Sequence, residues 1–175
     1  MKKRFIEESL IFMNILKWFI LATLVGIIVG LATTFFIKTL DCATTKTTQL
    51  SYYIFLLPIG LFLSSLITKH IAPDAAGHGT EKVIEAIHKY AGKIPLFIAP
   101  VKFITTIITI AAGGSVGKEG PCAQIGGSLS SFCADVLQLN EADRRTLVIC
   151  GISAGFAAVF GTPIAGAIFG VEVLF

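Results

Sequence analysis

The chain has 175 residues, of which 54% are hydrophobic and 14% are charged, with a formal net charge of +3. Soluble domains usually carry about a quarter charged residues, so the composition disfavours an ordinary soluble domain and favours a membrane protein. The positive charges form no long basic run, so nothing in the sequence indicates a nucleic-acid partner.

The first predicted element is a membrane-spanning helix over residues 18–37. This stretch is uncharged between Lys17 and Lys38, and its length matches the roughly 20 residues that cross a bilayer core. Gly26 and Gly30 form a small-xxx-small pair, which suits close packing between membrane helices. The apolar stretch is too long for the core of a signal peptide, so a retained helix is expected.

A polar, threonine-rich loop is expected over residues 41–49, followed by a second uncharged span over residues 50–68. Lysines and arginines gather at residues 2–17 and again at residues 69–93, whereas the loop between the two spans is nearly neutral. By the positive-inside rule, this asymmetry predicts a cytoplasmic N-terminus.

The second half of the chain has shorter, interrupted apolar segments. A short amphipathic stretch over residues 80–90 is followed by apolar segments at 95–116, 122–139 and 146–171, with a charged turn at 140–145. Gly161-Thr-Pro163 breaks the last segment and predicts two short helices. Broken helices at membrane depth are tolerated only where they line protein or a watery cavity, and they are typical of transport sites.

A glycine-rich loop, Gly-Gly-Ser-Val-Gly-Lys-Glu-Gly-Pro, places Lys118 and Glu119 within this apolar region. Pro121 suits the first turn of a helix, and Gly117 and Gly120 allow the backbone to approach a ligand closely. A helix that begins near Glu119 would offer free N–H groups and its positive dipole end to an anion. The Glu119 carboxylate would compete with that anion. The alternative is a loop ion pair between Lys118 and Glu119 that caps the helix.

A second glycine-flanked loop, Gly77-His78-Gly79, opens the amphipathic stretch in the same way. The ring N–H of His78 is a candidate donor to an anion. The alternative is an ordinary loop histidine without a ligand.

Motifs for enzymatic or metal chemistry fail. A P-loop needs glycine where Ala112 stands and Ser or Thr where Glu119 stands. The GxSxG pattern around Ser153 lies in an apolar helix rather than in a strand–turn–helix. Glu85 and His88 lack the second copy that a carboxylate metal site needs, and the cysteines have no metal or disulfide spacing. We therefore expect neither an enzyme nor a bound metal or cofactor.

In chain order, Pro-Val-Lys102, GKEGPxxQIGG and GxxAGxAAxFxxPxAGxxFxxE resemble the CLC family of chloride channels and chloride/proton exchangers, also called the voltage-gated chloride channel family. The similarity runs from about residue 75 to residue 172. It implies an all-α, multi-pass membrane protein of inverted repeats, with short broken helices at the anion site. Only the first repeat is matched, so residues 1–175 are expected to be one transmembrane domain, the N-terminal half of a longer CLC-type domain.

The same resemblance implies roles for both glycine loops. Glu119 corresponds to the family's gating glutamate. The anion-binding residues that it implies are Gly77, His78, Gly79, Gly117, Lys118, Gly120 and Pro121. His78 replaces a serine that coordinates the central anion in the family, and Thr80-Glu81 replace an Ile-Pro pair. These departures bear on the selectivity or affinity of the central site.

The resemblance also bears on proton coupling. The inner proton-transfer glutamate of family exchangers falls at Val173, where family channels commonly have valine, while Glu172 is one residue away. We therefore expect a channel-like conductance for chloride or a similar small anion in a lipid bilayer, with a second copy as partner if the full-length fold is present. The alternatives are a proton-coupled exchanger and a truncated, non-conducting fragment that only packs against a partner chain.

Overall fold

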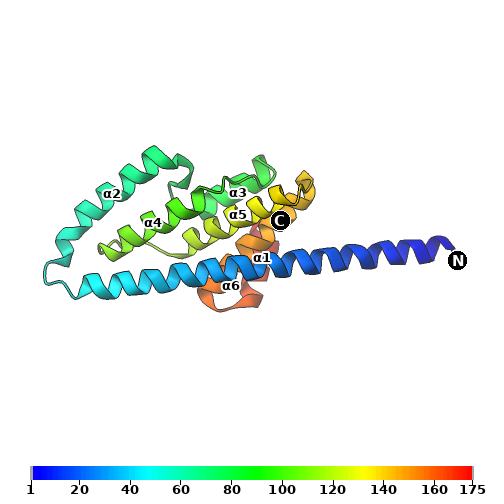
Figure 1. Cartoon of the computed structure of the whole chain (residues 1–175), viewed down its shortest axis with the longest axis horizontal. Coiled ribbons are helices and arrows are strands. Elements are labelled where there is room, and N and C mark those ends of the chain that lie inside the picture. Colours follow the sequence, from blue (N-terminus) through cyan, green and yellow to red (C-terminus); the bar gives the residue numbers. More distant parts are fainter. Residues whose placement is uncertain (1, 175) are drawn as a thin grey trace.

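The computed structural model describes residues 2–174, and this part of the chain is all helical. Its elements are α1 (Lys2–Thr48), η1 (Tyr53–Phe55), α2 (Leu56–Ile71), η2 (Pro73–Ala75), α3 (Thr80–Lys89), α4 (Ile98–Ala111), α5 (Glu119–Val136), α6 (Glu141–Phe160), α7 (Pro163–Phe169) and η3 (Gly170–Leu174). Figure 1 shows α1 running along the whole length of the molecule, with its N-terminal part extending beyond the other helices.

Helix α1 buries one narrow stripe and exposes the rest of its surface. The buried residues are Val25, Val29, Thr33, Phe36 and Leu40, which have the three- and four-residue spacing of a single helix face. Helix α1 packs against α4, α5 and α6. Large apolar side chains on its other faces are exposed, as expected for a lipid-facing helix. Within the described residues, α1 alone is long and apolar enough to cross a membrane.

Two predictions at the first connection are wrong. The expected loop at residues 41–49 is helical through Thr48. Thr44, Thr45 and Thr48 donate their hydroxyls to carbonyl oxygens one turn earlier, so these polar side chains are satisfied without leaving the helix. The second span is shorter than predicted, because α2 begins only at Leu56 and its 16 residues extend about 24 Å.

The predicted amphipathic stretch and the predicted break are confirmed. Helix α3 buries Val83, Ala86 and Ile87 and exposes its polar face. Gly161 ends α6 in the left-handed conformation at φ 67°, a common helix stop. Pro163 then opens α7, where its missing N–H is not needed.

The charged turn expected at residues 140–145 is instead the start of α6. The side chain of Asn140 accepts a hydrogen bond from the backbone N–H of Asp143 at 2.8 Å, an N-cap that satisfies one of the free donors of the first turn. The acidic residues that follow stand near the positive end of the helix dipole, where they are favourable. The segment at 146–171 thus holds one 20-residue helix, which begins at Glu141, and a short second helix.

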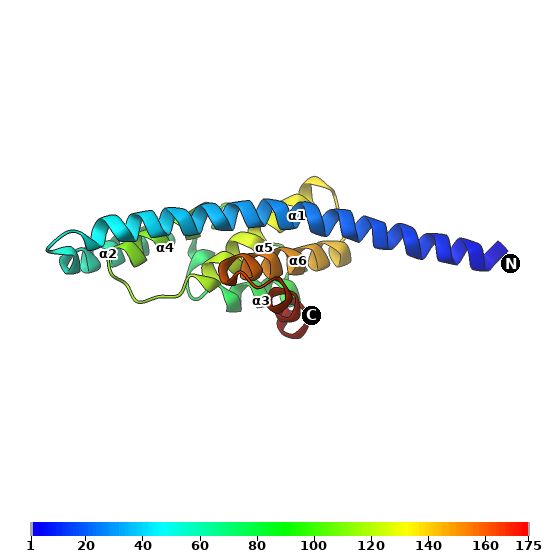
Figure 2. The same ribbon diagram turned by 90° about the horizontal axis from the view of Figure 1, so that it is seen from below.

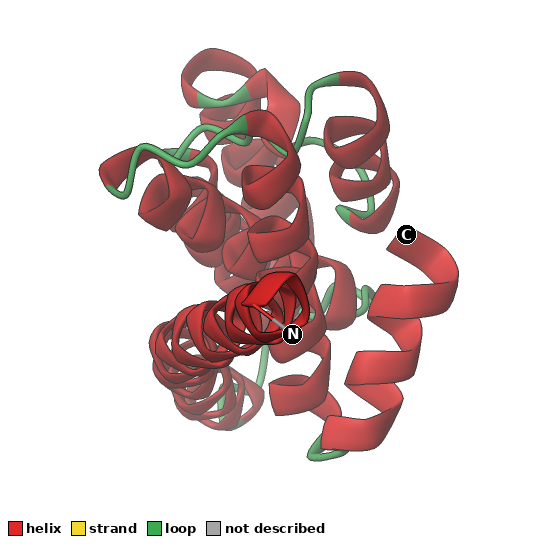
Figure 3. Cartoon of the chain, turned by 90° about the vertical axis from the view of Figure 1, so that its right-hand side faces the viewer, coloured by secondary structure: helices red, strands yellow, loops and turns green. Residues whose placement is uncertain are grey.

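Helix α5 lies at the centre of the fold and crosses α6 closely (Figure 2). A Cβ on Gly126 would overlap the carbonyl oxygen of Gly151, and one on Gly155 would lie 2.5 Å from the carbonyl oxygen of Cys122. Small residues therefore let the two backbones touch. Figure 3 looks along the long axis and shows the helices joined by short loops, with no strand in the described part.

Candidate functional site

The two glycine loops singled out by the sequence interlock. A Cβ on Gly120 would overlap the carbonyl oxygen of His78, and a Cβ on Gly79 would lie 2.6 Å from the carbonyl oxygen of Gly120. Gly79 also has a φ of 94°, which side chains other than glycine rarely adopt. The loop before α3 and the first turn of α5 are thus in direct backbone contact.

Two helix N-termini meet at this contact. Helix α3 begins after Gly79, and α5 begins at Glu119, as predicted, with Lys118 at its N-cap position. Neither N-cap residue accepts a hydrogen bond from the first backbone N–H groups with its side chain. The first N–H groups of a helix have no partner within the helix, and the dipole places partial positive charge there. Both termini lie beside one cavity of about 760 Å³, which therefore has the electrostatics of an anion site.

Most of the predicted site residues line this cavity. Glu119 does so, together with the anion-binding candidates Gly77, His78, Gly117, Gly120 and Pro121. Gly79 lies behind the lining, against Gly120. Lys118 is not among the lining residues, and its side chain is half-buried. The anion-binding roles of these residues stay predictions.

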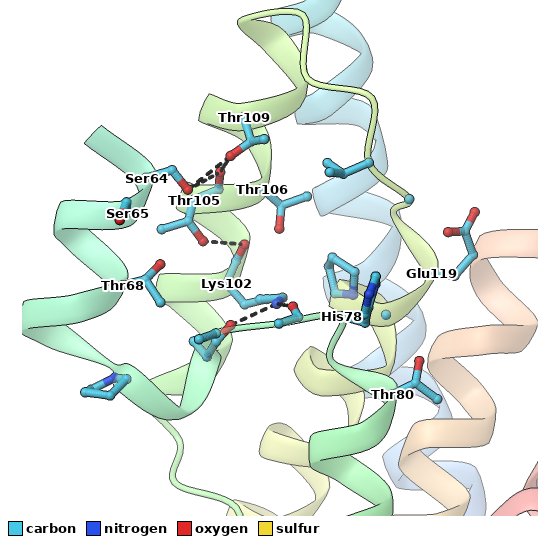
Figure 4. Close-up of a pocket in the computed structure, with 18 of the residues that line it drawn as sticks. Ser64, Ser65, Thr68, His78, Thr80, Lys102, Thr105, Thr106, Thr109 and Glu119 are labelled. Carbon is cyan, nitrogen blue, oxygen red and sulfur yellow. Dashed lines mark hydrogen bonds between the residues drawn. The ribbon is translucent and has the colours of Figure 1, made fainter. Parts of the chain in front are cut away.

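The Glu119 carboxylate folds back over its own loop. A Cβ on Gly117 would overlap Oε2 of Glu119, so the side chain covers the backbone of that glycine. Among the ion pairs of residues 2–174, none joins Lys118 to Glu119, in contrast to the capping ion pair considered as an alternative. Figure 4 shows Glu119 at the edge of the cavity, on the side where His78 lies.

Lys102 of α4 lines the cavity, whereas the sequence indicated it only as part of the Pro-Val-Lys motif and predicted no role for it in the site. Its side chain is only 6% exposed, and Nζ donates hydrogen bonds to the carbonyl oxygens of Ala75 at 2.8 Å and Gly77 at 2.7 Å (Figure 4). The lysine thereby fixes the loop that carries His78 and brings a positive charge to the cavity. A single lysine within an apolar helix was the available signal.

A second wall of the cavity consists of hydroxyl groups. These groups lie one helical turn or one residue apart on α2 and on α4: Ser64, Ser65, Thr68, Thr105, Thr106 and Thr109. Thr109 donates to Oγ of Ser64 at 3.0 Å, and Ser64 donates to the carbonyl oxygen of Thr105 at 3.3 Å. In Figure 4 these side chains lie across the cavity from Glu119. This hydroxyl wall was not predicted from the sequence, although serines and threonines at one-turn spacing are present in both apolar segments.

Val173, the position expected for a proton-transfer glutamate, lies outside the cavity lining. Val173 and Glu172 belong to the π-helical turn η3, and both are exposed. Neither is among the residues that line the cavity. The inference about proton coupling therefore stays a prediction.

Comparisons with known proteins agree on one family. The family model described as "Voltage gated chloride channel" matches residues 59–175. A chloride/fluoride channel protein of Pseudomonas syringae pv. tomato is 41% identical over 160 residues, which cover 91% of this chain and 35% of that protein. An H⁺/Cl⁻ exchange transporter, ClcA, of Salmonella paratyphi A is 33% identical over 165 residues, with 87% and 35% covered. Both are named as transport proteins rather than enzymes.

Among solved structures, a slow cyanobacterial Cl⁻/H⁺ antiporter is similar, with a TM-score of 0.80 and 24% identity, over 89% of this chain and 39% of that chain. This likeness confirms the predicted all-α fold as part of a CLC-type fold. The chain spans 35% of the length of the two curated relatives.

Proposed function

The chain belongs to the voltage-gated chloride channel family, and from that membership we propose that it forms part of a membrane pathway for chloride or a similar small anion. Residues 1–175 then form one transmembrane domain, the N-terminal half of a longer CLC-type domain with a cytoplasmic N-terminus. A second copy is the expected partner of the full-length fold.

The observation that carries this proposal is the meeting of two helix N-termini at one cavity. Unpaired N–H groups and two dipole ends favour a negative charge there, and Lys102 adds a full positive charge. Because the contact is made by glycines, no side chain stands between the two helix N-termini. No covalent step is needed, because the site only has to bind and release its ligand.

Glu119 is proposed as the gate. Its carboxylate stands in the first turn of α5 and lines the cavity, where it carries the same charge as the permeating anion and competes for the same donors. Protonation or displacement of this side chain removes the competitor. Gating by Glu119 therefore predicts that anion flux rises as the carboxyl group becomes protonated.

A channel-like conductance is the leading proposal, because valine occupies position 173. A proton-coupled exchanger is the second candidate, since Glu172 is adjacent and one similar protein is named as an exchange transporter. Proton movement measured during chloride flux distinguishes the two candidates: a channel moves chloride without protons, and an exchanger moves both.

Chloride efflux from liposomes that contain the purified 175-residue chain tests the proposal. We expect flux above that of protein-free vesicles, with a pH dependence that Glu119→Gln abolishes. Glu141→Gln is the matched control, because Glu141 also stands in the first turn of a helix but lies outside the cavity. Flux equal to that of empty vesicles would instead support the non-conducting fragment, and an unchanged pH profile in Glu119→Gln would reject the gate.

A further inference from the structure

We propose a second anion-binding position on the hydroxyl wall of the cavity. Its donors are the hydroxyl of Thr106, the free N–H of Lys102 and the hydroxyl of Thr68. This inference rests on the proposed function, because it assigns the wall opposite the helix N-termini to the same ligand. The ligand class is a small monovalent anion of the halide type.

The first observation is a hydroxyl that faces the cavity without a protein partner, on a side chain that is otherwise buried. Thr106 is 6% exposed and lines the cavity, yet its hydroxyl makes no hydrogen bond with the described residues. Its neighbours on α4 behave differently: Thr105 donates to the carbonyl oxygen of Val101 at 2.9 Å and Thr109 to that of Thr105 at 2.8 Å. Bonding to the preceding turn is the usual solution for a threonine in an apolar helix. Thr106 has not adopted it, so its donor is free to bind a ligand.

The second observation is a spare donor on Lys102. An ammonium group has three N–H donors and no acceptor, and two of the three are used by Ala75 and Gly77. Lys102 and Thr106 are four residues apart on α4, so they lie one above the other on the same helix face. Figure 4 shows the Thr106 hydroxyl directed into the cavity on the side where Lys102 and His78 lie.

The chemistry of this wall selects an anion. The lysine offers donors only, and the hydroxyls of Thr106 and Thr68 can turn their hydrogens toward a negative ligand. Thr68 lines the cavity from α2, and its hydroxyl, like that of Thr106, makes no hydrogen bond with the described residues. The charged groups of the lining are Lys69, Lys102 and Glu119, which leaves an excess of positive charge. This excess of positive charge repels a cation, although the hydroxyls could also accept hydrogen bonds.

Chloride binding by the full chain in detergent, measured by equilibrium dialysis with radioactive chloride, tests the inference. Thr106→Val keeps the shape of the side chain and removes the donor. We expect it to weaken chloride affinity about tenfold or more, since deleting a hydrogen bond to a charged group costs at least about this much. Thr106→Ser restores the hydroxyl and is expected to recover most of the affinity.

Thr33→Val is the matched control. Thr33 is also buried in a helix and its hydroxyl also has no partner, but it belongs to α1 and does not line the cavity, so chloride affinity should stay at the wild-type value. Equal losses in both valine variants would show a general disturbance of the fold and would overturn the inference. Wild-type affinity in Thr106→Val would also overturn it and would leave the proposed function intact. Absence of chloride binding by the wild-type chain would reject both proposals together.

Discussion

The two walls of the cavity use different parts of the chain to face the same space. The loop wall, around Gly79 and Gly120, offers backbone groups that are held in place by steric contact. The hydroxyl wall, on α2 and α4, offers side chains from regular helices. A substitution in the loop wall therefore moves the neighbouring backbone, whereas a substitution in the hydroxyl wall can change one side chain and leave the others in place.

The largest expected effect is on the loop wall. Gly120→Ala places a methyl group on the carbonyl oxygen of His78, and neither backbone can yield without separating the loops. We expect a loss of about 3 kcal/mol or more in the free energy of unfolding, at the upper end for overpacking. Thermal unfolding in detergent, followed by circular dichroism, measures it.

Gly26→Ala is the control for this substitution. Gly26 lies within α1, and apart from its own turn of helix no atom lies within 4 Å of the position that its methyl group would take, so alanine should be neutral or stabilise the helix by up to about 1 kcal/mol. A Gly120→Ala protein as stable as Gly26→Ala would show that the loops are not interlocked.

The next largest loss of stability is expected when Lys102, which joins α4 to the loop before α3, is replaced. Lys102→Met removes the donors of the Ala75 and Gly77 carbonyl oxygens, and we expect a loss of about 2 kcal/mol, in the range for hydrogen bonds to charged groups. Hydrogen exchange at residues 76–80 should accelerate, because the loop loses its anchor. Lys38→Met, an exposed lysine on α1, should change neither quantity, and equal exchange in the two variants would contradict the anchoring role.

A smaller effect is expected within the hydroxyl wall. Thr109→Val removes the hydroxyl whose one hydrogen is shared between Ser64 and the carbonyl oxygen of Thr105, but it leaves Ser64 bonded to that carbonyl. The expected cost is about 1 kcal/mol, that of one neutral hydrogen bond. Hydrogen exchange in the loop wall should stay unchanged. Faster exchange at residues 76–80 would show that the two walls are not independent.

The smallest effect lies outside both walls, on the amphipathic helix α3. The hydrogen bond and charge of Lys89, with a further contribution from Lys82, lower the pKa of the Glu85 carboxyl. A lowered pKa in the folded state gives stability that is present above the ordinary carboxyl pKa and is lost as pH falls through the lowered value. Lys89→Met should raise the pKa of Glu85 toward its ordinary value in a carboxyl NMR titration, with no change in the cavity. An unchanged pKa would contradict the pairing.

The ends of helices were predicted well wherever a single residue determines the backbone geometry. Gly161 and Pro163 stop and restart a helix by their own backbone geometry, and the start of α5 at Glu119 follows from Pro121 in its first turn. The threonine-rich end of α1 was missed because a threonine hydroxyl can serve either a loop or the carbonyl of the preceding turn. The same ambiguity concealed the role of Asn140, whose cap turns a charged turn into a helix start.

The walls themselves were harder to predict. Both glycine loops were recognised as anion-site candidates, but their direct contact depends on how α3 and α5 pack, which no single stretch of sequence specifies. The hydroxyl wall needed the register between α2 and α4. Within each segment, hydroxyls such as Ser64 and Thr109 look like tolerated polar residues in an apolar run. Their pairing exists only after the two helices are side by side.

The contact between Gly79 and Gly120 also limits how this region can move. With backbone against backbone and Lys102 holding the preceding loop, the N-termini of α3 and α5 behave mechanically as one rigid part. Their separation cannot widen or narrow in small steps, since every step would open a gap or create a clash in a close-packed region. Opening and closing beside these termini is therefore left to groups that rotate about single bonds, and a side chain such as Glu119 can do so on a timescale that the backbone cannot follow.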